Sequence, residues 1–136
     1  MFLTRLLYFS YCTTEKDMEI DQILQSARKY NAQNNITGAL WFDGDIFVQV
    51  LEGDRRKVSE TYHRIAADTR HRDIELVSCG TVDRRFFHEW RMGYYADTEA
   101  NRSLVLKYSG EDKLVPWRLP EGALLQLLAA GQLTGS

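Results

Sequence analysis

The chain has 136 residues, of which 44% are hydrophobic and 26% charged, and its formal net charge is −2. This length suits one domain with a full hydrophobic core, and the composition is that of an ordinary globular protein. The small net charge gives no electrostatic basis for binding nucleic acid or anionic membranes, and no apolar run approaches the roughly 20 residues of a membrane-spanning helix.

The first predicted element is a strand over residues 2–11, which is apolar on both faces. Such a strand is expected at the centre of a sheet that is covered on both sides. The same segment lacks the layout of a signal peptide. Tyr8 lies in the middle of the strand, so its phenol is expected to point into a covered layer and to need a hydrogen-bond partner there.

The two cysteines, Cys12 and Cys79, do not have the spacing of a metal site. We interpret them as two reduced thiols rather than a disulfide, which is typical of a cytoplasmic protein.

A helix is predicted next, capped by Thr13 or Thr14, with Asp17 in a variant capping box. Asn34-Asn35 is expected to end this helix, because Asn tolerates the left-handed conformation. The apolar stripe of the helix has five members at helical spacing: Ile20, Ile23, Leu24, Ala27 and Tyr30.

Asn31 falls on the same buried stripe, four residues after Ala27. A polar side chain at this position either caps the C-terminus of the helix or serves a purpose inside the protein. The residues alone favour neither interpretation.

Two strands joined by the turn Asp43-Gly44-Asp45 follow, since Asp-Gly between apolar runs is a strong hairpin signal. The second of these strands, residues 46–51, alternates apolar residues on both faces, as a strand covered on both sides would. Gln49 is the exception, because a buried amide without hydrogen-bond partners costs about 1–3 kcal/mol. The sequence therefore predicts a polar group beside Gln49.

A second helix is predicted to open at Asp54, with a buried stripe of Val58, Tyr62, Ile65 and Ala66. Arg64 and Asp68 lie four residues apart on its flank, a spacing at which they can pair. Such a surface ion pair would contribute little stability.

A polar turn over residues 68–72 contains His71, which alone would be interpreted as a surface or capping histidine. Residues 73–82 are predicted to form a fourth strand, and residues 90–95 a fifth. Trp90 and Met92 are expected to share one face of that fifth strand as ordinary core residues.

The predicted order over residues 2–96 indicates an α+β fold, a ferredoxin-like βαββαββ sandwich with both helices on one sheet face. Two additional C-terminal helices, over residues 100–109 and from Pro120 to about Gly131, are expected to cover the other sheet face. They could equally expose apolar surface to a partner. We divide the chain into a domain of residues 1–96 and a C-terminal helical extension of residues 97–136.

Five short motifs occur in order: LLYFS in the first strand, Asn-x-x-x-x-Ile-Thr-Gly from Asn31 to Gly38, FVQVLEG, DTRHRD and WRMG. Together they resemble the BLUF family, the small flavin-binding sensors of blue light. The resemblance covers residues 2 to 96. The chain departs from the family pattern at Asn35, where Gly is usual, and at Arg91, where a small residue is frequent.

The resemblance implies a flavin ring between the two helices, on the sheet face that they cover. It places Tyr8 and Gln49 at the reactive edge of the ring, Asn31 at a ring carbonyl and the neighbouring nitrogen, and Arg64 near the other carbonyl. Met92 and Trp90 match a pair whose placement beside the glutamine varies within the family. The remaining implied contacts are the ring-flanking Ile23, Leu24, Ala27 and Ile65 and a polar cluster of Asp68, Arg70 and His71.

The resemblance also implies a mechanism, in which proton-coupled electron transfer from Tyr8 to the excited flavin leaves Gln49 rearranged by rotation or tautomerisation. The flavin is bound without a covalent bond, and FAD is expected, with FMN or riboflavin as alternatives. The implied protein is a photoreceptor that signals by protein–protein contact, through the sheet face or the C-terminal helices, and a homodimer is one form of that contact. No metal, nucleic acid or membrane is expected to take part.

Two other functional classes compete with this hypothesis, because a fold does not by itself determine function. One is a flavin-dependent enzyme or a light-insensitive flavin-binding adaptor. We expect no enzyme, because the sequence has no nucleophile–base pair and no glycine-rich phosphate loop. The other is a cofactor-free adaptor, which leaves Tyr8, Asn31 and Gln49 as buried polar residues without a common purpose.

Overall fold

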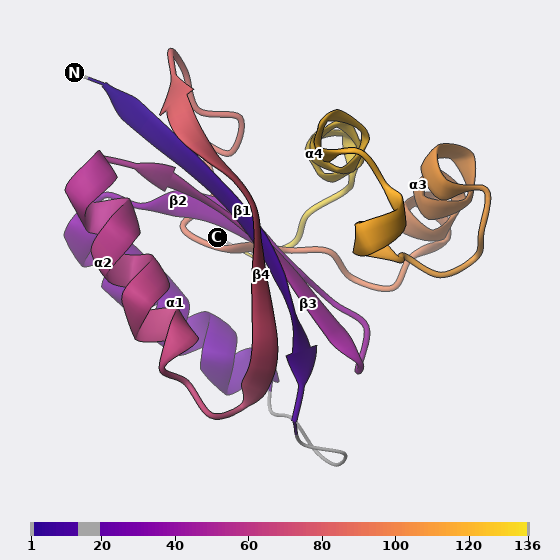
Figure 1. The fold of residues 1–136 in the computed structure, drawn as a ribbon, viewed down its shortest axis with the longest axis horizontal. Helices are drawn as coiled ribbons and strands as arrows, with labels where there is room; N and C mark the ends of the chain where they lie inside the picture. The colour runs from indigo at the N-terminus through magenta and orange to yellow at the C-terminus, as the bar shows by residue number, and fades with distance from the viewer. Residues whose placement is uncertain (1, 14–19, 136) are drawn as a thin grey trace.

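The computed structural model describes residues 2–13 and 20–135. A five-stranded sheet lies between two layers of helices, with α1 and α2 on one face and α3 and α4 on the other (Figure 1). The strands are β1 (Leu3–Cys12), β2 (Thr37–Phe42), β3 (Ile46–Gly53), β4 (His71–Val82) and β5 (Gly93–Tyr94). The helices are α1 (Ile20–Asn34), α2 (Arg55–Ala66), α3 (Glu99–Ser109) and α4 (Glu121–Ala130), with a short 3₁₀ helix at Pro116–Arg118.

The strand order is β4-β1-β3-β2-β5, with β1 antiparallel to both of its neighbours and β5 parallel to β2. This order confirms the ferredoxin-like sandwich, and the two C-terminal helices cover the second sheet face as expected. The register of the central pair places Tyr8 of β1 directly opposite Gln49 of β3. Directly opposed residues project to the same face of a sheet, so these two side chains lie together.

The hydrophobic core has two parts, one on each face of the sheet. Alternate residues of β1 and β3 divide between them, which confirms the prediction that both strands are covered on both sides. The helix-side core, between the sheet and α1 and α2, contains Leu6, Tyr8, Leu24, Phe47, Leu51, Val58 and Met92. The tail-side core, between the sheet and α3 and α4, contains Leu7, Phe9, Val48, Val50, Val105, Leu124, Leu127 and Leu128.

Local capping and turn chemistry explains where several elements begin and end. Asn35 has φ 53°, so it ends α1 in the left-handed conformation that the sequence predicts at this position. Asp54 caps α2 by accepting a hydrogen bond from the backbone N–H of Arg56. Gly110 ends α3 with φ 73°, and Gly44 in the hairpin turn has φ 99°, both as expected for glycine.

The predicted cap of the first helix stays a prediction, because the residues that would follow the cap lie outside the described part of the chain. Thr13 extends the end of β1, since its backbone N–H donates to the carbonyl of Arg70 and its hydroxyl donates to the carbonyl of Thr69. The described part of α1 begins only at Ile20. Thr14 and Asp17 lie outside the described residues.

The fifth strand is much shorter than predicted, because only Gly93 and Tyr94 pair with β2. The preceding residues are irregular and do not alternate between the two faces. Met92 is consequently buried in the helix-side core, whereas Trp90 packs against the tail-side core. The prediction that these two residues share one face is therefore wrong.

Helix α2 buries a slightly different stripe from the one predicted. Ala66 is exposed, and Thr61 is buried in its place. Burial of Thr61 is tolerated because its hydroxyl donates to the carbonyl of Lys57, one turn earlier, over 2.6 Å. The fourth strand also begins two residues earlier than predicted, at His71.

Candidate functional site

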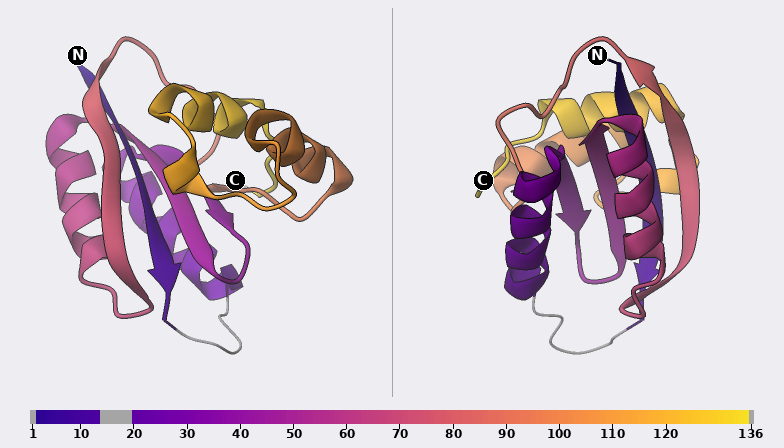
Figure 2. Two further views of the ribbon diagram at one scale, coloured as in Figure 1. Left: turned by 45° about the vertical axis from the view of Figure 1, so that its right-hand side comes forward. Right: turned by 90° about the vertical axis from the view of Figure 1, so that its left-hand side faces the viewer.

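A pocket opens between α1, α2 and the sheet face that they cover, with about 800 Å³ of atom-free space that includes solvent at its mouth. Figure 2 shows the two helices side by side on this face, with strands visible between them. Ten residues implied by the sequence resemblance line the pocket: Tyr8, Ile23, Ala27, Asn31, Gln49, Arg64, Ile65, Asp68, Arg70 and His71.

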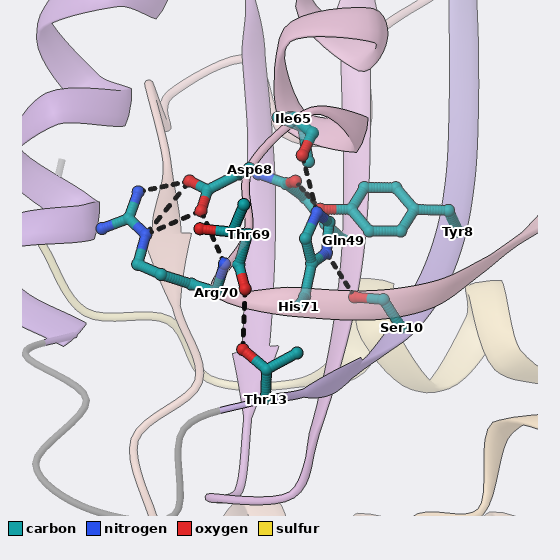
Figure 3. A network of polar contacts seen from close by, with 9 residues as sticks. All are labelled: Tyr8, Ser10, Thr13, Gln49, Ile65, Asp68, Thr69, Arg70 and His71. Atoms are coloured by element: carbon teal, nitrogen blue, oxygen red, sulfur yellow. Dashed lines mark hydrogen bonds and ion pairs between the residues drawn. The ribbon is translucent and has the colours of Figure 1, made fainter.

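Tyr8 and Gln49 form the polar centre of the pocket floor. The hydroxyl of Tyr8 donates a hydrogen bond to Oε1 of Gln49 (Figure 3). Burial raises the pKa of the Tyr8 phenol far above its ordinary value, with smaller contributions from Tyr62 and Asp68, so Tyr8 remains a neutral donor. Tyr8 is thus a polar partner of the kind that the sequence predicts beside Gln49.

The other end of the Gln49 amide meets a weak acceptor. Its Nε2 donates to the thioether sulfur of Met92 over 3.4 Å. Rotating the amide by half a turn would bring Nε2 to the Tyr8 oxygen and Oε1 to a sulfur that carries no proton. The two orientations of the Gln49 amide therefore differ in the hydrogen bonds that they can make with Tyr8 and Met92.

Asn31 is buried on the pocket wall, inside α1 rather than at its end. Its side chain is therefore not the C-terminal cap that the sequence left as an alternative. Nδ2 donates to the carbonyl of Arg91 over 2.5 Å. Within residues 2–13 and 20–135, Oδ1 of Asn31 accepts no hydrogen bond, so this pocket-lining residue retains an open acceptor.

His71 is fixed between β1 and α2 rather than exposed at the surface (Figure 3). Its Nε2 lies 2.6 Å from the carbonyl oxygen of Ile65, and its Nδ1 lies 2.8 Å from the hydroxyl of Ser10. A carbonyl can only accept, so Nε2 carries a proton, and in the neutral ring Nδ1 accepts from Ser10. The ring thereby connects the end of α2 to the strand that carries Tyr8.

The predicted ion pair between Arg64 and Asp68 is absent from the described structure. Asp68 pairs instead with Arg70, two residues later in the same turn, which also donates its backbone N–H to Asp68. Arg64 lies over the ring of Tyr30, with 4.2 Å between the guanidinium carbon and the ring centroid. The short turn favours the local pair, and the aromatic ring on α1 offers the arginine a cation–π contact.

Asp68 also gives a pH-dependent contribution to stability. Hydrogen bonds from Arg70 lower the pKa of the Asp68 carboxyl below its ordinary value, against the opposing effect of partial burial. A lowered folded-state pKa means that the contribution is present at neutral pH and is lost as the pH falls through the folded pKa.

We therefore expect the Tm difference between the wild type and Asp68→Asn to shrink as the pH is lowered from 7 towards 3. The difference should be small, because the pair is partly exposed. Thermal unfolding at a series of pH values measures it, and Asp73→Asn provides the control of an exposed aspartate in the neighbouring strand. A Tm difference that grows on acidification would contradict the assignment.

Three residues implied by the resemblance lie outside the pocket lining. Leu24 is buried in the helix-side core, and Met92 touches Gln49 without forming pocket wall. Trp90 packs on the opposite side of the sheet. Six further residues line the pocket that the resemblance does not imply: Ser26, Tyr30, Leu40, Phe47, Leu51 and Thr61. Helical spacing from Ile65 and Ala27 could have indicated Thr61 and Tyr30.

The pocket combines apolar walls from Ile23, Ala27 and Ile65 with polar groups that converge from two sides. Asn31 and Gln49 together present amide donors and acceptors, and Tyr8 supplies a neutral hydroxyl. This donor set suits a flat heteroaromatic ring whose edge carries both N–H and carbonyl groups. The fold and the site thus define a small-ligand-binding α+β domain whose floor holds an amide with two usable orientations.

The family model described as "BLUF: Sensors of blue-light using FAD" matches residues 3–93. The chain belongs to this family, whose members bind flavin and sense blue light. Photoactivated adenylate cyclase subunit beta of Euglena gracilis is 36% identical over 92 residues, which are 66% of this chain and 11% of that protein. The blue light- and temperature-regulated antirepressor BluF of Escherichia coli K12 is 34% identical over 86 residues, which are 62% of this chain and 21% of that protein.

Solved structures of similar length share the whole architecture. The photo-activated state of BlsA matches with a TM-score of 0.85 and 28% identity, over 98% of this chain and 99% of that one. The dark state of BlrB, a BLUF protein, matches with a TM-score of 0.77 and 27% identity, over 95% and 96% of the two chains. By contrast, the chain spans only about a tenth to a fifth of the two sequence relatives described above.

No helix among the described residues is long and apolar enough to cross a membrane. No disulfide joins Cys12 to Cys79 in the described structure. Within residues 2–13 and 20–135, no cluster of three or more His, Cys, Asp or Glu side chains is arranged to hold a metal ion.

Proposed function

We propose that this chain is a blue-light switch in which the Tyr8–Gln49 pair responds to a flavin held in the pocket between α1 and α2. The observation that carries the proposal is the hydrogen bond from the Tyr8 hydroxyl to Gln49 on the pocket floor. A buried neutral phenol beside an amide with two usable orientations is a pair whose proton and hydrogen bonds can be rearranged.

The pocket residues divide the binding of the flavin ring between them. Ile23, Ala27 and Ile65 would flank the ring, with Leu24 supporting them from the core. Asn31 would accept a ring N–H through its open Oδ1. Arg64 would approach a ring carbonyl from the mouth of the pocket, where Asp68 and His71 form the polar end.

The flavin, when bound, supplies the light absorption and the capacity to accept an electron. Tyr8 would be the electron donor, and its hydroxyl would release its proton towards Oε1 of Gln49, the acceptor that it already faces. When the electron and the proton return to Tyr8, the Gln49 amide would be left turned or tautomerised, with its contacts to Tyr8 and Met92 exchanged and a hydrogen-bond donor offered to the pocket. The apolar walls exclude water, so the rearranged contacts are not replaced by solvent.

The test is the absorption spectrum of the purified protein. We expect a yellow protein with a red shift under blue light that reverses in the dark. A yellow protein without a shift would favour the light-insensitive adaptor, and a colourless protein that cannot be loaded with flavin would favour the cofactor-free one. Light-independent turnover of a substrate by the bound flavin would favour the enzyme.

We propose FAD as the physiological flavin, supported by the description of the family model. One similar solved structure is that of Klebsiella pneumoniae BlrP1 with FMN. Heat release of the bound flavin followed by chromatography separates FAD, FMN and riboflavin. Predominant FMN or riboflavin in protein purified without added flavin would contradict the proposal.

We further propose that the chain signals by protein contact from the cytoplasm, without catalysis of its own. The C-terminal helices are the favoured contact surface, because the sheet face beneath them is already covered while Leu106 and Trp117 remain 56% and 54% exposed. A homodimer is one form that such a contact would take. Light scattering in the dark and under blue light tests this, and a light-independent monomer would favour a different protein as the partner.

We expect Asn31→Ala to weaken flavin binding more than changes at Tyr8 or Gln49. The variant removes the open acceptor and the bond to the Arg91 carbonyl, which leaves polar groups unpaired at about 1–3 kcal/mol each. Fluorescence titration of the apoprotein measures the dissociation constant. Asn34→Ala is the matched control, because Asn34 bonds only within α1, to the carbonyl of Tyr30. Equal affinities of Asn31→Ala and the wild type would contradict a binding role.

A further inference from the structure

Glu52, at the end of β3, has a fully buried carboxylate that the proposed switch does not use. It lies on the tail side of the sheet, opposite Arg5 of β1. Its two oxygens accept three hydrogen bonds: from Nε of Arg5 over 2.8 Å, and from the backbone N–H groups of Phe86 and Phe87 over 2.9 and 2.8 Å. A carboxylate satisfied in this way is strongly held, because each bond is assisted by its charge.

The two backbone groups that Glu52 holds begin an irregular segment, residues 86–92, which we call the anchor segment. Arg85, immediately before it, donates to Thr37 and to the carbonyls of Asn35 and Glu52. Within the segment, Trp90 donates its N–H to the carbonyl of Phe87 and accepts from the N–H of Gly38. The anchor segment is thus fixed at its start by side chains rather than by a sheet ladder.

The end of the anchor segment contacts both amides of the pocket. The carbonyl of Arg91 accepts from Asn31, and the sulfur of Met92 accepts from Gln49. The strand that follows pairs with β2 at Gly93 and Tyr94, and Nε of Arg28 donates to the carbonyl of Met92 over 3.1 Å. Met92 therefore lies between these attachments at the end of the segment and the Glu52 and Arg85 attachments at its start.

We propose that Glu52 is a positioning residue for the light switch. By fixing Phe86 and Phe87, it holds Met92 against Gln49, and so it raises the barrier that Gln49 crosses when the lit state returns to the dark state. This inference rests on the proposed function. It concerns the opposite sheet face, so Glu52 acts through the anchor segment and does not touch the flavin pocket.

The test compares Glu52→Gln with Asn101→Ala. Glutamine keeps the length of the side chain but loses the charge and turns an N–H₂ group towards a donor. Asn101 is also buried and also makes three side-chain hydrogen bonds with other residues' backbone groups, but it lies in α3, and its partners Ala96 and Gln132 lie outside the anchor segment. The pair therefore separates anchoring from a general loss of stability.

We expect hydrogen exchange at residues 86–92 to be faster in Glu52→Gln than in the wild type, already in the apoprotein. In the flavin-loaded protein, dark recovery should be faster by about fivefold or more, the scale of coupling between linked sites. Asn101→Ala should lower the Tm by a similar amount but leave hydrogen exchange at residues 86–92 and the rate of dark recovery close to those of the wild type. The flavin dissociation constant of Glu52→Gln should stay within about twofold of the wild-type value.

Unchanged recovery in a Glu52→Gln protein with faster exchange at residues 86–92 would overturn the proposal. Equal effects of Asn101→Ala would overturn it as well. If Glu52→Gln fails to fold, Arg85→Met loosens the same segment without leaving a buried charge unpaired. Hydrogen exchange at residues 86–92 and the rate of dark recovery are then measured on that variant, with the same expected results. A wild type without any light-induced shift would instead refute the proposed function, while the exchange experiment on apoprotein would still test the anchoring.

Discussion

Gln49→Leu is expected to retain flavin and to lose the light-induced red shift completely. Leucine fills a similar volume on the pocket floor but offers no hydrogen bond that could change partners. The apolar walls and Asn31 are untouched, so the ring should still bind. The variant also leaves the buried hydroxyl of Tyr8 without its acceptor, which should lower the free energy of unfolding by about 1–3 kcal/mol.

The measurement is a difference spectrum, lit minus dark, on protein with a determined flavin content. Phe47→Leu is the control, because Phe47 lies on the same strand and lines the same pocket without taking part in the Tyr8–Gln49 bond. We expect Phe47→Leu to keep the red shift. A normal shift in Gln49→Leu would mean that the switch does not operate through Gln49.

Tyr8→Phe is expected to bind flavin and to fail to form the lit state. Phenylalanine keeps the ring packed edge-on against Tyr62, whose centroid lies 5.7 Å away, and removes only the hydroxyl. Without it, Gln49 receives no proton and the excited flavin loses its adjacent electron donor. Because burial keeps the Tyr8 phenol neutral, the wild-type photocycle should not show titration of Tyr8 at any pH at which the protein is folded.

Transient absorption after a blue flash measures this prediction. Tyr62→Phe is the matched control, since it changes the same residue type beside Tyr8 and leaves the Tyr8–Gln49 bond intact. We expect Tyr62→Phe to complete a reversible photocycle. A full lit state in Tyr8→Phe would exclude Tyr8 as the donor and move that role to another aromatic residue.

The shortened fifth strand changes how a signal could cross the sheet. A regular strand at residues 90–92 could carry a signal by sliding one residue, which would swap its two faces, but the structure has no such strand there. The irregular chain already reaches both cores, with Met92 on the helix side and Trp90 on the tail side. We expect light-dependent hydrogen exchange at residues 86–94, and changes restricted to the pocket would exclude this route.

Most of the fold could be predicted from the sequence because its signals are local. The two-sided apolar pattern of β1 and β3, the Asp-Gly turn and the caps at Asp54 and Gly110 each depend on neighbouring residues. The buried polar residues on these apolar faces could also be identified from the sequence. Gln49 and Asn31 stand out because a buried amide needs partners, and motif order then connected both to one family of flavin-binding proteins.

The tertiary structure decided which groups meet. The sequence pattern requires a polar neighbour for Gln49, but only the register between β1 and β3 brings Tyr8 to it. Only the tertiary structure shows that Met92 rather than Trp90 lies beside Gln49. It also shows that Asp68 forms its ion pair with Arg70 and not with Arg64. Glu52 drew no attention in the sequence, because a carboxylate near a strand end is normally solvated. Spacing along the chain determines which residues share a helix face or a strand face, whereas contacts between residues about 40 to 60 positions apart depend on how the elements pack.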